Sequence, residues 1–242
     1  MRVLVTRPRE DAAGLVAALA ANGHEVVLEP LLTIVPRAQP DWPAGHEQAQ
    51  ALLITSANGA RAFARLDSRR DLPVYAVGDA SAAEASALGF RQVVSAAGDV
   101  EDLAALVRRC LDPGAGPLLH PAAGRLAGDL QGALAAAGFV VLRAVLYDAV
   151  MADALSPETT RIINDGLIDV VTFFSPRTAA AFVSLIQAAD LTPACRKIAV
   201  LCLSPAVAAE LSGVAWRRVC VAALPAQSAL VAALDDATAG DT

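Results

Sequence analysis

The amino-acid sequence predicts an α/β protein made of two similar parts, each with parallel strands covered by helices. Short apolar runs alternate with Ala-rich segments of helical length, which is typical of parallel sheets buried on both faces. Of the 242 residues, 55% are hydrophobic and 18% are charged, so a large buried core can form. The phrase LLITSANGARAFARL at 52–66 also recurs in similar form as VVTFFSPRTAAAFVSL at 170–185.

In the first half, the predicted elements follow one another as strand, turn and helix. RVLVTRP at 2–8 predicts a strand that ends in a turn, and Asp11–Ala21 predicts a helix that Gly23 ends. EVVLEPLLTIV at 25–35 predicts a second strand, and ALLITSANGARAF at 51–63 predicts another strand, turn and helix. Residues 74–94 predict a further strand, turn, helix and strand, and Asp102–Cys110 predicts one more helix.

The second half repeats these units in the same order, which predicts an internal duplication. The matches are Leu15, Leu19 and Gly23 with Leu130, Leu134 and Gly138, each 115 positions on; Ser56 and Phe63 with Ser175 and Phe182, each 119 on; and Glu84 and Phe90 with Glu210 and Trp216, each 126 on. Three ordered units with insertions only between them exceed what Ala-rich composition alone explains.

The predicted turns at the strand ends are candidate anion sites. In parallel sheets, ligands bind beyond the carboxyl ends of the strands. Unpaired N–H groups and the helix dipole at a helix start favour a negative charge. The turns are at 6–8, 55–58, 78–81, 120–124, 174–178 and 203–206. The alternative is plain helix capping by Ser56, Ser81, Ser175 and Ser204.

Composition excludes several other classes of protein. Cys110, Cys195, Cys202 and Cys220 form no CxxC pair, and the three histidines lie far from them, so we expect reduced thiols and no metal cluster. A net charge of −6 without a basic run disfavours nucleic acid. No apolar run reaches the roughly 18–20 residues of a membrane span, and the N-terminus does not resemble a signal peptide. We therefore expect a cytoplasmic protein.

The chain resembles the uroporphyrinogen-III synthase (HemD-like) family along nearly its whole length. The resemblance rests on several motifs in order. They are VLVTRP at 3–8, GHEVVLEPLLTI at 23–34, ITSANGARAF at 54–63, VYAVGDASA at 74–82, LYDA at 146–149 and FFSPRTAAAF at 173–182. Together, in this order and spacing, the motifs identify the family.

The resemblance implies a particular domain organisation. It implies two similar flavodoxin-like, three-layer α/β domains with parallel sheets, joined by two linker strands near 33–38 and 145–153 with a cleft between the domains. Domain one would be 1–35 plus 151–242, and domain two would be 36–150. The repeat alone would instead cut the chain near 112–117. Both partitions contain the same units, and we follow the family.

The resemblance also implies the chemistry. The substrate would be hydroxymethylbilane, a linear tetrapyrrole with eight carboxylates. The family removes its terminal hydroxyl as water and closes the macrocycle with the last pyrrole ring inverted, without a metal or organic cofactor. The bilane closes spontaneously to the symmetric isomer, so the enzyme has to favour the inverted geometry. We expect a monomer with no nucleic-acid or membrane partner.

Tyr147 is the candidate catalytic residue, because it matches a tyrosine of the family near the second linker. A phenol can donate a proton to the departing hydroxyl, which is worth about 10²–10⁴ in rate for a general acid. The alternative is that a tyrosine in the strand-like VLRAVLYDAV packs its ring and leaves its hydroxyl at a rim.

The substrate-binding candidates match the turns of the family and would bind carboxylates. They are Ser56, Ala57 and Asn58 in the first turn, Ser175, Pro176 and Arg177 in the second, Ser81, Ser204, and Thr6 with Arg7. A surface ion pair of Arg7 with Glu10 or Asp11 is the alternative for that arginine. The sequence departs from the family after Ser204, where Pro205–Val207 replace a threonine. For His120, at a predicted strand end, we expect a packed or solvated ring, and the alternative is a neutral partner at the rim of the cleft.

Two competing hypotheses remain open from the residues themselves. A non-enzymatic two-domain α/β binding or sensor protein for a small anion would show the same turns. The effect of Tyr147→Phe separates the two, because a binder would lose affinity and not product formation. A dinucleotide-binding enzyme is disfavoured, since the glycine-rich stretch at 78–82 lacks the GxGxxG spacing.

Overall fold

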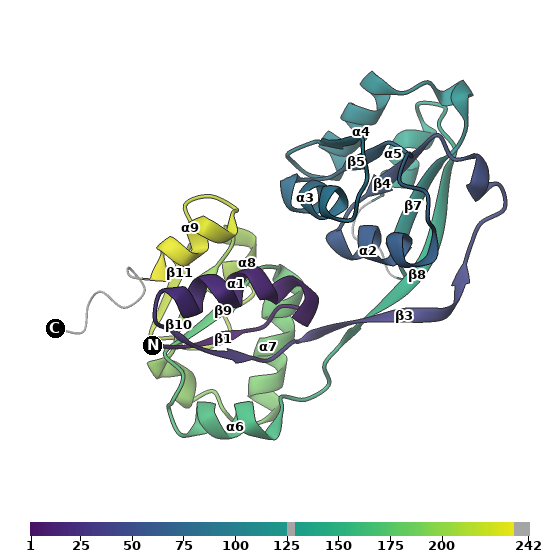
Figure 1. Ribbon diagram of the computed structural model, residues 1–242. Coiled ribbons are helices and arrows are strands. Elements are labelled where there is room, and N and C mark those ends of the chain that lie inside the picture. Colours follow the sequence, from purple (N-terminus) through teal and green to yellow (C-terminus); the bar gives the residue numbers. More distant parts are fainter. Residues whose placement is uncertain (125–128, 235–242) are drawn as a thin grey trace. The chain divides into compact units, whose positions relative to one another are not determined.

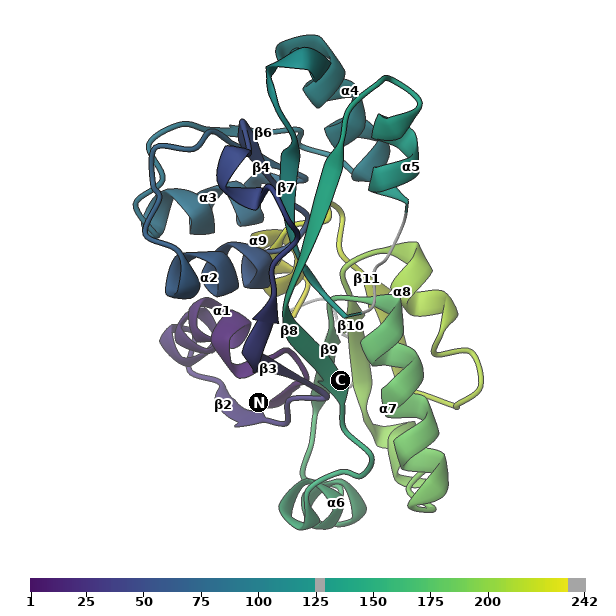
Figure 2. The same ribbon diagram turned by 90° about the vertical axis from the view of Figure 1, so that its right-hand side faces the viewer.

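The computed structural model describes residues 1–124 and 129–234. By their contacts, these residues form two compact units (Figures 1 and 2). Unit 1 contains Met1–Thr33 and the described residues from Val150 onward, and unit 2 contains Ile34–Ala149. Each unit has its own sheet and its own hydrophobic cores.

Unit 1 contains a five-stranded sheet in the order β11-β10-β9-β1-β2, and all neighbouring strands are parallel. The strands are β1 (Arg2–Val5), β2 (Glu25–Leu28), β9 (Val170–Phe173), β10 (Ala199–Cys202) and β11 (Arg218–Val221). Val3 of β1 lies beside Val26 on one side and Val170 on the other. In chain order this is the 2-1-3-4-5 arrangement of flavodoxin-like folds.

Helices cover both faces of this first sheet. On one face, Leu4, Val171 and Val200 pack against α6 (Pro157–Asn164), α7 (Pro176–Ala188) and α8 (Pro205–Ala209). On the other face, Val3 and Val5 pack against α1 (Arg9–Ala21) and α9 (Gln227–Ala232). Because successive strand residues point to opposite faces, both faces need apolar side chains, and the strands are continuous apolar runs.

Unit 2 contains a six-stranded sheet in the order β3-β8-β7-β4-β5-β6. The strands are β3 (Leu32–Asp41), β4 (Ala51–Ile54), β5 (Val74–Ala76), β6 (Val93–Ser95), β7 (Leu118–Ala123) and β8 (Val141–Met151). From β8 to β6 the neighbours are all parallel. The predicted fold class of two similar α/β parts with parallel sheets is therefore confirmed.

The second sheet is also a middle layer between helices. Leu52 and Ile54 pack in a core with α2 (Ala57–Leu66) and α3 (Asp79–Ala87). Ala51 and Leu53 pack in the opposite core with α4 (Val100–Cys110) and α5 (Leu130–Ala135). Short 3₁₀ helices occur at His46–Gln48, Pro113–Ala115 and Ala194–Lys197.

The sequence repeat corresponds to equivalent positions in the two sheets. The strand pairs matched by the repeat are β1 with β7, β9 with β4 and β10 with β5. In the first sheet they occur in the run β2-β1-β9-β10-β11, and in the second in the run β8-β7-β4-β5-β6. A residue on one sheet can therefore be compared with its partner on the other.

The single strand predicted over 25–35 is wrong. β2 ends at Leu28 and β3 begins at Leu32, and the two strands belong to different sheets. Pro30 has no N–H for a ladder. The buried Glu29 carboxylate accepts hydrogen bonds from the Ser156 N–H at 2.8 Å, the Ser156 hydroxyl at 2.7 Å and the Thr159 hydroxyl at 2.6 Å. These contacts with α6 end the strand, and hydrophobic patterning cannot reveal them.

Other predicted bounds shift by a few residues. The turn predicted at 120–124 is strand up to Ala123, so His120 lies within β7. α1 begins at Arg9 instead of Asp11. α4 begins at Val100 instead of Asp102, because Asp99 and Asp102 form a capping box that starts the helix two residues earlier than the apolar pattern indicates.

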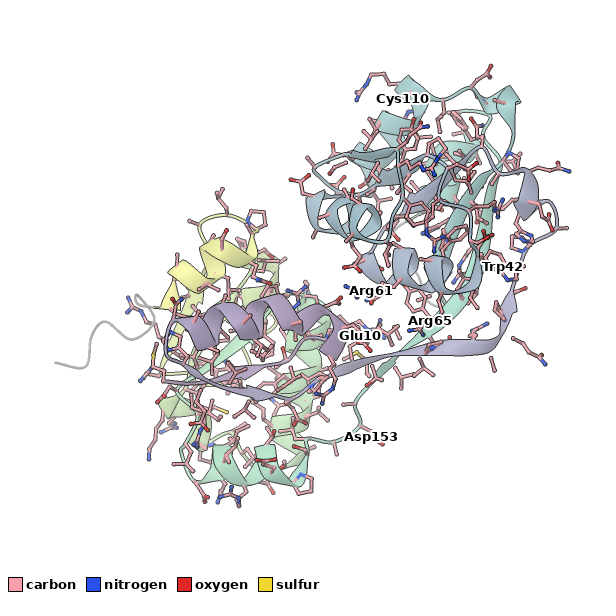
Figure 3. All side chains as sticks on the ribbon, in the orientation of Figure 1. Glu10, Trp42, Arg61, Arg65, Cys110 and Asp153 are labelled. Carbon is pink, nitrogen blue, oxygen red and sulfur yellow. The ribbon has the colours of Figure 1, made fainter. Side chains whose placement is uncertain are left out.

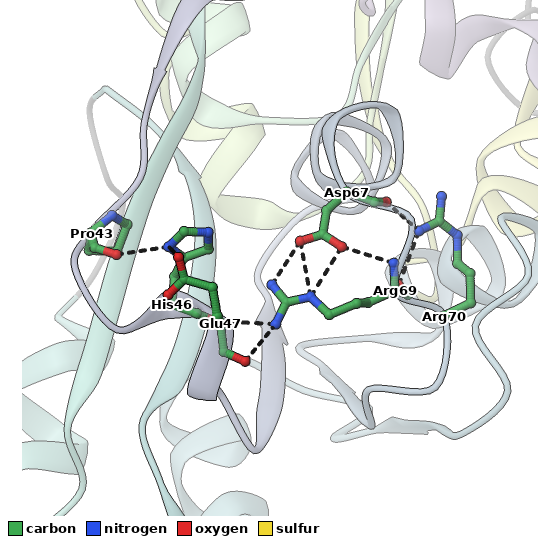
Figure 4. A network of polar contacts seen from close by, with 6 residues as sticks. All are labelled: Pro43, His46, Glu47, Asp67, Arg69 and Arg70. Carbon is green, nitrogen blue, oxygen red and sulfur yellow. Dashed lines mark hydrogen bonds and ion pairs between the residues drawn. The ribbon is translucent and has the colours of Figure 1, made fainter.

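Arg69 connects the segment after α2 to the segment before β4 by hydrogen bonds (Figure 4). The Arg69 guanidinium donates to the Asp67 carboxylate at 2.7–3.1 Å and to the main-chain oxygen of Glu47 at 3.0 Å. Burial by itself would raise the pKa of Asp67, but the hydrogen bonds and charge of Arg69 outweigh it and the pKa is lowered. This network shapes the loop and contains none of the candidate site residues.

The cysteines are free thiols, as expected. Burial raises the pKa of Cys195 to about 11 and that of Cys202 to about 12, so both are unreactive near neutral pH. Cys110 is exposed on α4 (Figure 3). Among the described residues, no helix is long and apolar enough to cross a membrane.

Candidate functional site

The predicted site residues lie at or just beyond the carboxyl ends of strands in both units. In unit 2, these are Ser56, Ala57 and Asn58 after β4, Ser81 after β5, and Tyr147, which lies within β8 and is level with Ala123 at the end of β7. In unit 1, they are Thr6 and Arg7 after β1, Ser175, Pro176 and Arg177 after β9, and Ser204 after β10. This is the sheet edge at which parallel α/β proteins bind ligands.

Ser56 and Tyr147 are in direct contact in unit 2. The Ser56 Oγ and the Tyr147 hydroxyl lie 3.1 Å apart, a hydrogen-bond distance, although the residues are 91 positions apart in the chain. Ser56 is also the N-cap of α2, and its hydroxyl accepts from the Gly59 N–H at 3.4 Å. The candidate acid thus meets the start of a helix, where N–H groups and the helix dipole favour a negative charge.

The Tyr147 ring is 6% exposed and packs in the core between the second sheet and α2 and α3. β8 has a register shift opposite Ala122 and Ala123, which brings Tyr147 level with Ala123 of β7. The Gly124 N–H donates to the Tyr147 carbonyl at 3.2 Å, which fixes the backbone there. Bulges of this kind redirect a side chain near active sites. Ring packing and a polar hydroxyl contact therefore occur together.

Asp148, the next residue on β8, forms an ion pair with the neighbouring strand β3. Both oxygens of its carboxylate accept from the Arg37 guanidinium of β3 at 2.9 Å. A Cβ on Gly124 would come within 2.7 Å of the Asp148 Oδ1, so glycine allows β7 to end against this pair.

The first turn of α2 is held by an arginine on the same helix. Arg61 donates to the Asn58 side-chain oxygen at 2.9 Å and makes two 2.9 Å bonds to the Glu84 carboxylate of α3 (Figure 3). Asn58 is therefore already hydrogen-bonded through its side chain.

Ser81 lies in the first turn of α3 and is 7% exposed. The N-cap of α3 is Gly78, which has no side chain to cap the helix. The capping alternative is therefore wrong for Ser81 and correct for Ser56. The hydroxyl of Ser81 does not occupy a cap position and belongs to the buried part of the turn.

In unit 1, Ser175 begins α7 in the way that Ser56 begins α2. Its hydroxyl accepts from the Thr178 N–H at 3.2 Å and lies 2.9 Å from the Thr178 hydroxyl. Pro176 and Arg177 follow as exposed residues of the first turn. Capping is also correct for Ser175.

Thr6 and Arg7 differ in their surroundings. Thr6 is 1% exposed and donates its hydroxyl to the Thr172 carbonyl of β9 at 2.8 Å, so it ties β1 to its neighbour. The Arg7 guanidinium carbon lies 4.2 Å from the centre of the Phe174 ring, and its Nη1 donates to Gln227 at 3.1 Å. Arg7 is therefore held beside the Ser175 turn by a cation–π contact.

Ser204 occupies the N-cap position of α8, but its side chain makes no cap hydrogen bond. α8 has only five residues, so its dipole is weak. Capping by the side chain is wrong for Ser204. Its hydroxyl is the group that could replace the threonine of the family.

The sequence analysis missed a second polar contact at the α2 turn. Thr55 Oγ1 lies 3.1 Å from His120 Nε2, and His120 is 3% exposed within β7. Burial, and then the charge of Arg143, lower the pKa of His120 to about 4, so the ring is neutral near pH 7. Two features of the sequence could have indicated this contact. Thr55 is a hydroxyl residue directly before Ser56, and His120 is a single polar residue in the apolar run PLLHP.

A further element of the turn is Gly59. A Cβ at this position would lie 2.6 Å from the Pro121 carbonyl of β7, so only glycine lets α2 approach the strand so closely. Among the described residues, no group of three or more His, Cys, Asp or Glu side chains could hold a metal ion.

The fold and the site define a class of protein: an α/β protein of two similar parallel-sheet units whose strand-end turns present hydroxyl and amide donors, with a tyrosine among them. The family model described as uroporphyrinogen-III synthase HemD matches residues 13–232. The chain belongs to the uroporphyrinogen-III synthase family, which confirms the resemblance. It is accordingly a cyclising lyase of tetrapyrrole biosynthesis, and nothing in the comparisons favours a non-enzymatic binding protein.

Solved structures agree with this fold. A uroporphyrinogen-III synthetase from Helicobacter pylori matches with a TM-score of 0.64 at 14% identity, over 98% of this chain and 99% of that chain. A mutant uroporphyrinogen III synthase from Thermus thermophilus matches with a TM-score of 0.54 at 18% identity, over 98% of both chains. No curated protein matches the chain.

Proposed function

We propose that Tyr147 is the general acid with which this chain converts hydroxymethylbilane to uroporphyrinogen III. The phenol would donate its proton to the terminal hydroxyl of the bilane. The C–O bond then breaks, water leaves, and the pyrrole nitrogen supplies the electron pair that the carbon loses. The contact of 3.1 Å between Tyr147 and Ser56 carries this proposal, because it places the phenol at a turn of unit 2 that also offers helix N–H donors.

The strand-end turns would bind the substrate carboxylates. In unit 2 the donors are the first N–H groups of α2 and α3, at Ala57, Asn58 and Ser81, together with the Ser56 hydroxyl. In unit 1 they are Ser175 and Arg177 at α7, Ser204 at α8, and Arg7, whereas Pro176 has no N–H and would contribute through the shape of the first turn of α7. Thr6 acts through the backbone, since its hydroxyl bonds the neighbouring strand.

Local donors suit this substrate because the overall charge of the protein opposes it. A net charge of −6 repels a polyanion at long range. Neutral N–H groups and hydroxyls act only at short range and bind a carboxylate by hydrogen bonds. We propose that such groups hold the bilane in the pose that leads to inversion of its last ring.

The test is the isomer and the rate of product from freshly prepared hydroxymethylbilane. We expect the wild-type protein to give the III isomer. We expect Tyr147→Phe to lower kcat about 100-fold, the low end for a lost general acid, because the pyrrole already expels the hydroxyl. A wild-type rate for Tyr147→Phe would contradict the acid role. Formation of the I isomer alone at the uncatalysed rate by the wild-type protein would contradict the function.

We also propose that the two units are the domains expected from the family, at 1–35 plus 151–242 and at 36–150. The protein would act as a monomer in the cytoplasm, without a nucleic-acid or membrane partner. The negative net charge supports the absence of nucleic acid. Light scattering coupled to size exclusion measures the oligomeric state, and a mass of two chains would contradict the monomer.

A further inference from the structure

Two consecutive residues at the start of α2 are held by two different strands. Thr55 Oγ1 lies 3.1 Å from His120 Nε2 of β7, and Ser56 Oγ lies 3.1 Å from the Tyr147 hydroxyl of β8. Thr55 and Ser56 share a peptide bond, so a displacement of either moves the other. The His120 contact is therefore coupled mechanically to the Tyr147 contact.

The two contacts lie on opposite faces of the second sheet. Leu53 and Leu118 pack in the core with α4 and α5, and alternation along the strands places Thr55 and His120 on the same face. Tyr147 packs in the core with α2 and α3. The turn is thus held from both faces, which restricts its rotation as well as its translation.

β7 supports both partners of the Ser56–Tyr147 contact. Next to His120, the Pro121 carbonyl lies where a Cβ on Gly59 of α2 would clash at 2.6 Å. At the end of the strand, the Gly124 N–H donates to the Tyr147 carbonyl at 3.2 Å. One strand therefore sets the position of the helix start and of the tyrosine.

The fold itself does not require a polar pair at this place. Thr55 corresponds to Phe174 in the repeat, and His120 corresponds to Val5. Val5 belongs to the apolar core between the first sheet and α1 and α9, and Phe174 packs against that core with Arg7 over its ring. Unit 1 therefore builds the same strand ends from apolar side chains, although burying a polar ring carries a desolvation cost.

We propose that His120 is a positioning residue, which holds the Thr55 hydroxyl and thereby keeps Ser56 beside the Tyr147 hydroxyl. This inference rests on the proposed role of Tyr147. The low pKa of His120, about 4, keeps the ring neutral in the working pH range, and a neutral imidazole has one donor and one acceptor to match a hydroxyl. Arg143 is the charged group that faces the ring.

The first experiment measures kcat and KM for Thr55→Val and His120→Phe, each alone and combined with Tyr147→Phe. With Tyr147 present, we expect each single variant to lower kcat about five- to tenfold with a smaller change in KM, because the misplaced phenol acts in the transition state. Combined with Tyr147→Phe, the same changes should add less than about twofold, because they act through that hydroxyl.

Matched variants separate positioning from stability. Thr55→Ser keeps the hydroxyl, and His120→Gln places an amide nitrogen near the Nε2 position, so both should retain most of the wild-type kcat. Thr159→Val removes a buried hydroxyl in unit 1 that donates to Glu29 at 2.6 Å. It should lower the melting temperature while leaving kcat per folded molecule unchanged. Thr55→Val is the isosteric variant to rely on if His120→Phe does not fold.

A spectroscopic readout reports Tyr147 directly. The chain has two tyrosines, Tyr75 and Tyr147, so protein labelled with ¹³C at the tyrosine Cζ should give two resonances, assigned with Tyr75→Phe. We expect Thr55→Val to shift the Tyr147 resonance and Thr159→Val to leave it in place. A merely structural role of Thr55 and His120 would not move this signal in the folded protein.

The outcomes distinguish this inference from the proposed function. Loss of activity in Tyr147→Phe with wild-type kcat in both Thr55→Val and His120→Phe would overturn the inference and leave the acid role intact. Equal fold-losses with and without Tyr147 would also overturn it, because His120 would then act independently of the phenol. Wild-type activity of Tyr147→Phe would overturn both.

Discussion

The two units have the same strand order, yet they place different residues at the same positions. At the strand ends next to the serine turn, unit 1 has two apolar residues: Val5 lies in a core, and the partly buried Phe174 packs against it. Unit 2 has His120 and Thr55 in a hydrogen bond of 3.1 Å. In the described part of the chain, the hydrogen bonds of the Ser175 hydroxyl in unit 1 stay within its own helix start, whereas Ser56 also contacts a tyrosine from another strand.

This difference separates what the fold needs from what the chemistry needs. Both units need apolar runs, small residues at the turns and a capped helix start, because each sheet is buried on both faces. Only unit 2 has a buried polar pair and a tyrosine hydroxyl at these strand ends among the described residues. We infer that unit 2 carries the proton donor and that unit 1 mainly binds carboxylates.

The largest expected effect is a loss of stability when Glu29 is replaced. Unit 1 is built from two separate segments of the chain, and the Glu29 carboxylate connects them. Glu29 joins the first segment of unit 1 to α6 by three hydrogen bonds of 2.6–2.8 Å. Glu29→Ala should lower the free energy of unfolding by roughly 3 kcal/mol, because buried donors lose a charged partner. Glu84→Ala, which breaks the partly exposed ion pair with Arg61 in unit 2, should cost less, about 1 kcal/mol. Urea unfolding measures both, and equal losses would contradict this contrast.

The second effect is a pH dependence of the free energy of unfolding, which comes from the ionisation of His120. The corresponding residue of unit 1 is Val5, which does not titrate. The folded pKa of about 4 lies below the ordinary value of 6.5, so folding favours the neutral ring. Its contribution is complete above pH 6.5 and is lost as the pH falls through about 4, by roughly 3 kcal/mol. Unfolding of His120→Gln, followed from pH 7 to pH 4, should show a smaller decrease than the wild type. Parallel curves would show that His120 is solvated.

The third effect compares the packing of the two helix starts. Gly59 corresponds to Thr178 in the repeat, where a side chain is accommodated. Gly59→Ala would place a Cβ 2.6 Å from the Pro121 carbonyl, so α2 must move, at a cost of about 2 kcal/mol. Thr178→Ala should cost less, because it creates no clash. Thermal unfolding compares the two, and a stabilised Gly59→Ala protein would show that α2 moves freely.

The smallest expected effect on stability comes from replacing the two capping serines, and the two replacements should have equal effects. Ser56→Ala and Ser175→Ala should each cost about 1 kcal/mol, the usual value of an N-cap. Their activities should differ, since only Ser56 touches Tyr147: kcat should fall about tenfold for Ser56→Ala and less for Ser175→Ala. Equal losses of kcat would contradict the assignment of proton donation to unit 2.

The sequence supported the fold class, the duplication and the family, because these depend on features that recur along the chain. Apolar runs and capped, Ala-rich helices can be recognised locally. The break at Glu29 could not be recognised, because the partners of its carboxylate lie 127 and 130 residues further on. The contact of Ser56 with Tyr147 was also invisible, although both residues were candidates, since it joins positions 91 residues apart.

The sequence by itself determined that two similar parallel-sheet units form, and it predicts anion-binding turns at their strand ends. Only the tertiary structure decided which strand belongs to which sheet and which turn receives the tyrosine. The physical reason is that local propensity depends on neighbours within a few residues, whereas hydrogen bonds such as Thr55–His120 depend on how β4, β7 and β8 are brought side by side.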